Sequence, residues 1–360
     1  MGAHTDSMTV KPVSNPVIAL DVMGGDAGLP DVMAAAEIAS ERYPALRFRL
    51  HGPEPRIRAE FVRCPRLSGS AIVVHTDEVV LGTDKPSQAL RRSRTSSMGM
   101  AIQCVKNGDA HAAVSAGNTG ALMAMALFAL RTMPGIDRPA LAALLPTLKN
   151  DVAVLDLGAN TECDAENLVQ FAVMGAVFAR TVLGLENPRV ALLNIGVEEL
   201  KGTDELRDAA ALLRTAQLPM RFEGFVEGDK IGQGNVDVIV TDGFSGNIAL
   251  KTVEGTAKLV TGLLANAFRS TWLTQLGYLL SRGALRALGA HLDPNAHNGA
   301  VFLGLNGLIV KSHGSANVRG IANAIGVAHD LIIGNVGERI ATDLANFRAH
   351  RPDVPAAPAA

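Results

Sequence analysis

Cysteine, aromatic residues and net charge are scarce in this chain of 360 residues. The three cysteines, Cys64, Cys104 and Cys163, show no CxxC spacing, which gives neither a disulfide framework nor a cysteine zinc site. The formal net charge is -2, so the basic excess that binds nucleic-acid phosphates is missing. We therefore expect a protein of the reducing cytoplasm that has no nucleic-acid partner.

Long apolar runs are absent as well. The longest uninterrupted one, residues 121–130, is too short to span a bilayer, and the N-terminus lacks the cationic and apolar regions of a secretory signal. Hydrophobic residues make up 48% of the chain and charged residues 19%, which is typical of a soluble α/β protein. The sequence thus predicts a chain that is neither secreted nor transmembrane.

We expect one continuous domain over residues 16–348, because no long linker or low-complexity tract interrupts them. Residues 1–15 are polar and contain proline, and residues 349–360 are rich in proline and alanine. We predict that both segments are disordered, the first as a leader and the second as a tail.

Six short apolar runs share one pattern, in which a strand-length run ends in glycine and small polar residues and a helical pattern follows. They lie within residues 17–26, 112–120, 152–160, 190–196, 239–247 and 308–314. This pattern is typical of parallel strands that are covered on both faces by helices. Since ligands bind beyond the carboxyl ends of such strands, we predict that the six polar segments converge on one crevice.

The residue types in these segments suit an anion. Glycines allow backbone N–H groups to come close to an anion, and asparagine or lysine donors complete the site. The side chains that we expect in the crevice are Asn118, Asn160, Asn194, Asn247, Lys201 and His313, with Asp21, Asp26, Asp156 and Asp242 among them.

Several of these features have a plainer interpretation. Gly24 and Gly25 could form only a tight turn, and His313 could be a structural cap or an acid/base group. Cys163 is better explained as an inert buried thiol than as a nucleophile, because no histidine is near it in sequence. The basic run at residues 85–94 is either a solvated face or a docking patch for an acidic partner.

Three helices are expected beside these segments. Residues 121–131 have almost no polar face, which indicates a buried helix, and residues 166–185 form an amphipathic pattern. Ser315 is expected to cap the long helix that follows the last strand.

Residues 255–292 contain no aspartate or glutamate, and their apolar residues recur near helical spacing. Basic groups opposite an apolar face are typical of a helix in an anionic membrane interface. A dimer interface or an ordinary pair of core helices would explain the same pattern. The membrane-associating candidates are Leu263, Leu264, Phe268, Trp272, Leu276, Arg282 and Arg286.

Together the motifs at residues 21–26, 115–121, 156–160, 194–202, 242–247 and 311–314 closely resemble the PlsX family of acyl-acyl carrier protein:phosphate acyltransferases. The resemblance runs from about residue 17 to the helix after His313. It implies a three-layer α/β/α sandwich with a mostly parallel mixed sheet, similar to isocitrate and isopropylmalate dehydrogenases, with residues 255–292 as a protruding amphipathic helical segment. It also implies a homodimer that attaches peripherally to the cytoplasmic membrane.

The reaction that the resemblance implies is transfer of a fatty acyl group from acyl carrier protein to inorganic phosphate, for use by a membrane acyltransferase. Phosphate is itself the nucleophile, so no protein nucleophile, cofactor or metal is expected. Our hypothesis is that Lys201, His313 and Asn247 act on phosphate and oxyanion, while Asp242 orients donors and either His313 or Lys201 protonates the departing thiolate. The expected binding residues are Gly24, Gly25, Asp26, Ser115, Asn118, Thr119, Gly120, Asp156, Asn160, Asn194, Gly243, Ser245, Gly246 and Ser315.

Three other functions fit parts of the pattern. A phosphotransacetylase would use acyl-CoA and need an adenine pocket, and a nicotinamide-dependent decarboxylating dehydrogenase would need aspartates spaced for a metal. A membrane-associated scaffold without activity would leave the six polar strand ends unexplained.

Overall fold

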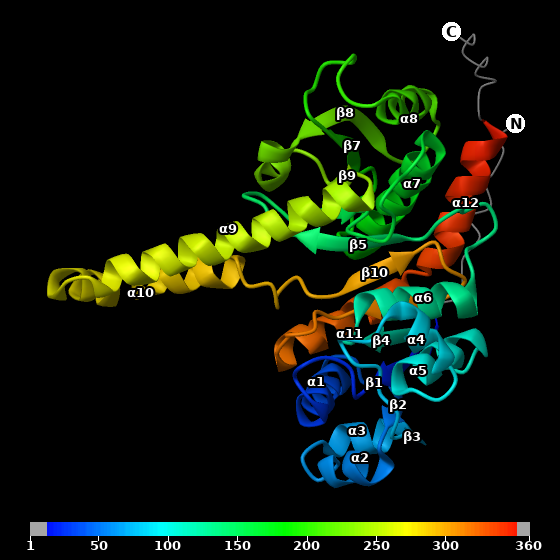
Figure 1. The fold of residues 1–360 in the computed structure, drawn as a ribbon, viewed down its shortest axis with the longest axis vertical. Coiled ribbons are helices and arrows are strands. Elements are labelled where there is room, and N and C mark those ends of the chain that lie inside the picture. Colours follow the sequence, from blue (N-terminus) through cyan, green and yellow to red (C-terminus); the bar gives the residue numbers. More distant parts are fainter. Residues whose placement is uncertain (1–12, 351–360) are drawn as a thin grey trace, which may run out of the picture.

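The computed structural model describes residues 13–350, and its centre is one sheet of eleven strands (Figure 1). Across the sheet the order is β3-β2-β1-β4-β11-β10-β5-β6-β9-β7-β8. The strands are β1 (Val17–Asp21), β2 (Arg47–Gly52), β3 (Ala71–His75), β4 (Ala112–Ser115), β5 (Ala140–Leu145), β6 (Val152–Leu155), β7 (Arg189–Asn194), β8 (Arg221–Glu227), β9 (Val238–Val240), β10 (Ala300–Leu303) and β11 (Leu308–Lys311). All six predicted strands are confirmed, as β1, β4, β6, β7, β9 and β11.

Helices cover both faces of the sheet, which confirms the three-layer α/β/α architecture (Figure 1). Helices α1, α7, α8, α11 and α12 bury one apolar cluster against the sheet, and α4, α5, α6 and the first turns of α9 pack on the other. The helices are α1 (Leu29–Arg42), α2 (Glu54–Glu60), α3 (Pro65–Ser70), α4 (Pro86–Arg91), α5 (Ser97–Lys106), α6 (Thr119–Leu130), α7 (Ala165–Val182), α8 (Asp204–Thr215), α9 (Gly243–Arg269), α10 (Trp272–His291), α11 (Val318–Ile333) and α12 (Val336–Ala349).

The sheet changes direction in its middle. Strands β3, β2, β1, β4 and β11 are parallel to one another, and so are β6, β9, β7 and β8. Between the two sets, β10 is antiparallel to both β11 and β5, and β5 is antiparallel to β6. Three successive reversals leave the two sets running in opposite directions. Their carboxyl ends therefore lie at opposite edges of the sheet, and the prediction that all six polar segments converge on one crevice is wrong.

The three helices expected from the sequence are present, but two of their predicted details are wrong. Helix α7 begins where Asp164 and Asn167 form a capping box, and its residues 167–179 are buried. Helix α6 buries one face, but Phe128 is 71% exposed on the other, so full burial was wrong. The cap of α11 is Asn317, whose side chain accepts a hydrogen bond from the Gly320 N–H, and not Ser315.

The predicted disordered ends lie largely outside the described residues, which exclude 1–12 and 351–360. Within the described part of the predicted leader, the partly buried Val13 packs against the core. Val13 packs on the face of the sheet that α1 and α11 cover.

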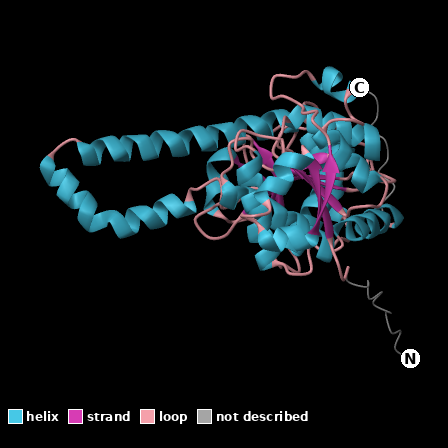
Figure 2. Cartoon of the chain, turned by 90° about the horizontal axis from the view of Figure 1, so that it is seen from below, coloured by secondary structure: helices cyan, strands magenta, loops and turns pink. Residues whose placement is uncertain are grey.

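Helices α9 and α10 form a long hairpin that projects from the sandwich (Figure 2). Its turn is held by Thr271, which forms a capping box with Thr274, and by the edge contact of the Phe268 and Tyr278 rings at 5.7 Å between centroids. In α9 only Gly243 and Gly246 are buried, and no residue of α10 is. Over residues 13–350, no helix combines the length and the apolar character needed to cross a membrane.

A buried histidine gives the fold a predicted pH dependence. His51 is the last residue but one of β2 and is 2% exposed, and neither of its ring nitrogens has a hydrogen-bond partner. Burial lowers its pKa to about 4, and the charge of Arg49 adds to the effect. In the unfolded chain the ring binds a proton near pH 6.5, so stability is lost as the pH falls from about 6.5 to 4, by roughly 2–3 kcal/mol.

Urea unfolding of the full chain at pH 7.5 and pH 5 measures this loss. The His51→Leu variant should show a smaller drop between the two pH values, whereas His291→Gln, a change at an exposed histidine, should behave like the parent. An equal drop in the parent and in His51→Leu would contradict the assignment.

Candidate active site

Three glycine-containing loops meet at the carboxyl ends of the adjacent strands β1, β4 and β11. The backbone N–H of Asp26 donates to the carbonyl oxygen of Gly314 over 2.8 Å, which joins the first loop to the third. A Cβ on Gly25, whose φ is +86°, would lie 2.7 Å from the Cβ of Ala116 in the second loop. Only glycine allows this approach, so the sequence at Gly25 fixes how closely the loops pack.

Asp21 and Ser115, the last residues of β1 and β4, connect the first two loops by a hydrogen bond. The Ser115 hydroxyl donates to the Asp21 carboxylate over 2.7 Å and accepts from the Gly117 N–H over 3.1 Å. The other carboxylate oxygen of Asp21 accepts from the Met23 N–H over 3.2 Å. Burial raises the pKa of Asp21, and these hydrogen bonds oppose the rise. The polar atoms of Asp21 and Ser115 therefore hold the two loops together.

Lys311, the last residue of β11, places a buried ammonium behind the three loops. The residue is 8% exposed, and its Nζ donates to the carbonyl oxygens of Ala116, over 3.3 Å, and Ser312. Burial lowers its pKa to about 8, while the carboxylates of Asp21 and Asp26 oppose the fall. Lys311 enters the sequence analysis only within the motif at residues 311–314. The signal for a site residue is a lysine at the end of an apolar strand, directly before a loop of small residues.

His313 lies two residues further on, exposed at the same loop. Its backbone N–H donates to Asn298 Oδ1 over 2.8 Å, and its Nδ1 accepts from the Ser315 N–H over 3.2 Å. Partial burial lowers the pKa of His313, the charge of Glu254 opposes this, and the nearby lysines lower the pKa further. The imidazole is therefore uncharged at neutral pH.

Helix α9 brings charged residues from the other half of the sheet to the surroundings of His313. The charges of Lys251, Glu254 and Lys258 all act on His313, and Lys251 also acts on Lys311. Their spacing of three and four residues puts them on one helix face, where Lys251 Nζ and Glu254 Oε2 lie 2.8 Å apart. Sequence reasoning missed these residues, since charges on a helix usually mark a solvated face. With Lys311, the two lysines give the surroundings of His313 an excess of positive charge.

Asp156 and Asn160 lie at the opposite edge, after β6, where they hydrogen-bond to each other. The Asp156 carboxylate accepts from the N–H groups of Leu141, Ala159 and Asn160 over 2.9, 3.0 and 2.7 Å. It also accepts from the Asn160 side chain over 2.9 Å, and this amide donates to the Pro139 carbonyl over 2.8 Å. Burial raises the pKa of Asp156, which is 0% exposed. The pair therefore holds this loop against the start of β5, and both oxygens of the Asp156 carboxylate are engaged.

The first turn of α9 packs directly on that pair. The Gly243 N–H donates to the Asn160 carbonyl over 2.7 Å, and a Cβ on Gly246 would lie 1.9 Å from the Asp156 carbonyl oxygen. Asp242 caps the helix by accepting from the Ser245 N–H over 2.8 Å. These predicted site residues are therefore brought together, but as the anchor of α9.

Asn247 and Cys163 flank the same anchor. Asn247 is exposed beside Gly158, where a Cβ would lie 3.5 Å from the Cβ of Asn247. Burial raises the pKa of the Cys163 thiol to about 12, with the charges of Asp156 and Asp242 adding to the rise. That value supports the interpretation of Cys163 as an inert thiol.

The remaining predicted donors stabilise their own loops. Asn194 accepts from the Ile195 N–H over 2.8 Å and donates to the Lys201 carbonyl over 3.1 Å, so it closes the loop after β7. Lys201 itself is exposed at this edge, opposite to that of His313.

At the crevice, Asn118 caps α6 by accepting from the Ala121 N–H over 2.9 Å. Its amide donates to the Gly82 carbonyl over 2.7 Å. Thr119 and Gly120 follow it as the first two residues of α6.

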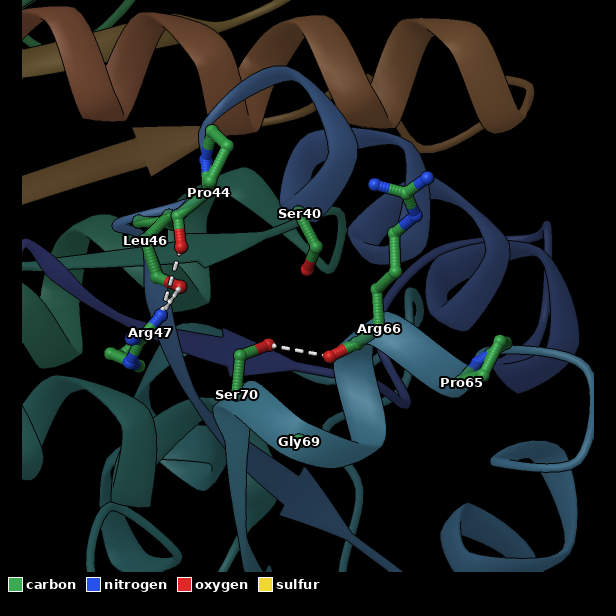
Figure 3. A pocket seen from close by; sticks show the side chains of 8 residues that line it. All are labelled: Ser40, Pro44, Leu46, Arg47, Pro65, Arg66, Gly69 and Ser70. Carbon is green, nitrogen blue, oxygen red and sulfur yellow. Dashed lines mark hydrogen bonds between the residues drawn. The ribbon is translucent and has the colours of Figure 1, made fainter.

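A cavity of about 400 Å³ lies elsewhere, between α1, α3 and the amino end of β2 (Figure 3). The guanidinium of Arg47 donates to the carbonyl oxygens of Pro44 and Leu46, and that of Arg66 lies 3.5 Å from Glu41. Both cations of this cavity are thus engaged with neighbouring oxygens. Among residues 13–350, no three His, Cys, Asp or Glu side chains are grouped to hold a metal ion.

Comparison with known proteins gives one consistent result. Residues 17–339 match the family model described as fatty acid synthesis protein. The chain is 59% identical to a phosphate acyltransferase of Erythrobacter litoralis over 337 residues, which are 93% of this chain and 95% of the relative. It is 56% identical to a phosphate acyltransferase of Rhodospirillum centenum, covering 92% and 94% of the two chains.

Solved structures show the same fold at low identity. A phosphotransacetylase from Streptococcus pyogenes superposes with a TM-score of 0.60 at 16% identity, over 89% of this chain and 94% of that one. The EutD phosphotransacetylase from Staphylococcus aureus gives a TM-score of 0.57 at 16% identity, over 90% and 94% of the chains. At this level of identity the likeness concerns the architecture alone.

The glycine contacts predict the effect of two matched substitutions. Gly25 and Gly28 both have positive φ, +86° and +79°, but a Cβ at Gly28 would meet only Pro30 Cδ at 3.9 Å. Gly28→Ala should therefore cost only backbone strain, about 1–3 kcal/mol of unfolding free energy. Gly25→Ala adds the clash with Ala116, so it should destabilise more and should weaken phosphate binding at least about tenfold.

Urea unfolding and isothermal titration with inorganic phosphate, both on the full chain, measure the two effects. Equal phosphate affinity in Gly25→Ala and Gly28→Ala would show that the loop packing does not shape the anion site.

Proposed function

The chain belongs to the family of fatty acid synthesis proteins, the PlsX family of phosphate acyltransferases, and from this we propose that it moves a long-chain fatty acyl group from acyl carrier protein to inorganic phosphate. It is an acyltransferase, and its product in this proposal is an acyl phosphate for phospholipid synthesis. The crevice at the ends of β1, β4 and β11 is the site that we assign to the reaction.

The observation that carries this assignment is the positive charge around His313: Lys311 lies two residues before it, and the charges of Lys251 and Lys258 lower its pKa. A hydrogen phosphate dianion needs positive charge and N–H donors around its oxygens, and a thioester carbonyl needs a donor where negative charge develops. The crevice supplies ammonium groups, an imidazole and glycine-rich loops at one place. Lys201 lies at the other sheet edge, so we propose Lys311 and the α9 lysines as phosphate ligands in its place.

The reaction balances without a protein nucleophile. An oxygen of hydrogen phosphate attacks the thioester carbon, the C–O bond forms, and the C–S bond then breaks. The proton that hydrogen phosphate carried ends on the thiolate, so the products are an acyl phosphate dianion and a free thiol. The protein has to hold the two reactants in contact and stabilise the oxyanion, which agrees with a crevice that has donors and cations but an unreactive Cys163.

A basic surface beside the crevice supports a carrier protein as the donor. Lys85, Arg91 and Arg94 are exposed on and around α4. The Asn118 amide ties the loop before α4 to the crevice through its hydrogen bond to the Gly82 carbonyl. We propose that this surface docks acidic acyl carrier protein. The alternative is an acyl-CoA donor, as in the phosphotransacetylases that share the fold.

We further propose that the hairpin of α9 and α10 attaches the enzyme to the membrane surface. Leu263, Trp272 and Leu280 are 60%, 73% and 81% exposed on it. Residues 255–292 carry cations and no carboxylate, which suits anionic lipid. An acyl phosphate is itself an amphiphile, so release at the membrane would bring it to a membrane acyltransferase. A second copy of the chain, in a homodimer, is the other partner that we propose for this hairpin.

Phosphate-dependent release of thiol tests the proposed reaction. The full chain is incubated with palmitoyl-acyl carrier protein, palmitoyl-CoA or acetyl-CoA, and both thiol and acyl phosphate are measured. We expect release from the carrier-linked donor that requires phosphate. Release from acetyl-CoA alone would assign the chain to the acyl-CoA enzymes, and no release from any donor would overturn the proposal.

The same assay separates the two lysine assignments. Lys311→Met should raise the KM for phosphate at least about tenfold, because a buried cation next to the anion is lost. Lys201→Met, the matched change at the opposite edge, should alter KM less than about threefold. The reverse order of effects would restore Lys201 as the phosphate ligand.

Vesicle binding tests the hairpin. The double variant Leu263→Glu, Leu276→Glu puts two carboxylates on its exposed apolar surface and should reduce cosedimentation with anionic vesicles at least about tenfold. Val62→Glu, a change at a residue that is 88% exposed elsewhere, should bind as the parent does. Unchanged vesicle binding of the double variant, with loss of a dimer in light scattering, would identify a second copy as the partner.

A further inference from the structure

The hydrogen bonds of His313 determine where its proton sits. Nδ1 lies 3.2 Å from the backbone nitrogen of Ser315 and 2.9 Å from its hydroxyl oxygen. A backbone N–H can only donate, so Nδ1 must be the acceptor and carries no proton. In the neutral ring the proton is then on Nε2, and the hydroxyl of Ser315 is free to donate to Nδ1 as well.

The loop that carries this ring is fixed from a second direction. Asn298, just before β10, is 7% exposed; its Oδ1 accepts from the His313 N–H over 2.8 Å, and its Nδ2 donates to Ser312 Oγ over 2.8 Å. Ser312 is 0% exposed. The buried side chains of Asn298 and Ser312 thus hold the backbone of His313, and the Ser315 N–H supplies the hydrogen bond that selects the tautomer of the ring.

The charges around the ring keep it neutral. From α9 it is faced by Lys251, Glu254 and Lys258, and from β11 by Lys311. Glu254 favours the imidazolium, but partial burial and the three ammonium groups oppose it, so the pKa of His313 falls below its usual value. An imidazolium would also lose the Ser315 N–H bond, because its Nδ1 would become a donor.

We infer that His313 works as a neutral imidazole whose Nε2–H donates to the thioester oxygen as negative charge develops there, and not as the acid or base of the reaction. This inference rests on the proposed phosphate acyltransferase function. No proton leaves the ring, because the proton of hydrogen phosphate already supplies the one that the thiolate takes. A neutral donor that is held in place in advance stabilises the oxyanion without changing its own charge.

Side-chain replacements at His313 separate a donor from an acid/base group. His313→Gln can present an N–H near the position of Nε2, whereas His313→Asn can do so only near Nδ1. We expect His313→Gln to keep at least about ten times the kcat of His313→Ala, with His313→Asn close to His313→Ala. Equal loss in all three variants, together with circular dichroism that shows each to be folded, would overturn the donor role.

Nitrogen NMR of the full chain, labelled at histidine, reads the tautomer directly. The His313 signals are assigned by their absence from the His313→Gln spectrum. We expect the Nε2–H tautomer at pH 7 and a titration below the usual histidine range. His297 is the internal control, because its Nδ1 lies 3.1 Å from Asp151 Oδ2 and this hydrogen bond raises its pKa. A protonated Nδ1 or a charged His313 ring at pH 7 would contradict the inference.

The NMR experiment and the thiol-release assay test different claims. The NMR experiment uses the free protein, so a chain that releases no thiol from any donor would overturn the proposed function while the tautomer remained measurable. A charged ring in a chain that does turn over would overturn the role of His313 and leave the acyltransferase reaction in place.

Discussion

The crevice depends on where α9 is anchored. Asp156 accepts four hydrogen bonds at the end of β6, and the first turn of α9 packs against this residue so closely that a side chain at Gly246 has no room. From that point the helix runs for 27 residues, about 40 Å, toward the other edge of the sheet. Without this anchor the charges of Lys251 and Lys258 would not reach the loop of His313.

This arrangement explains why two halves of a sheet with opposed strand directions still serve one site. The loops around His313 follow the carboxyl ends of β1, β4 and β11. The segments after β6 and β9 instead hold the first turn of α9 in place. Residues at both edges are constrained, but for different reasons. Asp156 and Asn160 maintain a helix position, whereas Lys311 and His313 face the place where an anion is expected.

The sequence predicted the fold well where the pattern was local. Each of the six apolar runs became a strand, because an apolar run that ends in glycine has few other ways to fold within a sandwich. The family resemblance, carried by motifs such as residues 242–247, was confirmed over residues 17–339. The reversal of the sheet was not predictable, since it depends on the pairing of β10 with β5, which is distant in sequence. Asp156 was placed at the site because residue type does not reveal which polar atoms are already paired, and Lys201 because the sequence does not show at which edge of the sheet a strand ends. Lys251 was overlooked because a charged helix face has the same sequence pattern whether or not it lies near a site.

Helix α9 also couples the exposed hairpin to the lysines near His313. The helix is fixed at its packed first turn, at Gly243 and Gly246, carries Lys251 and Lys258 further along, and ends in the exposed hairpin. Along the helix axis Lys258 lies roughly 20 Å from the packed turn, about halfway to Arg269 at the tip of the helix. A small rotation of the helix about the packed turn therefore moves Lys258 about half as far as it moves the tip, so whatever holds the hairpin also sets the position of the lysines.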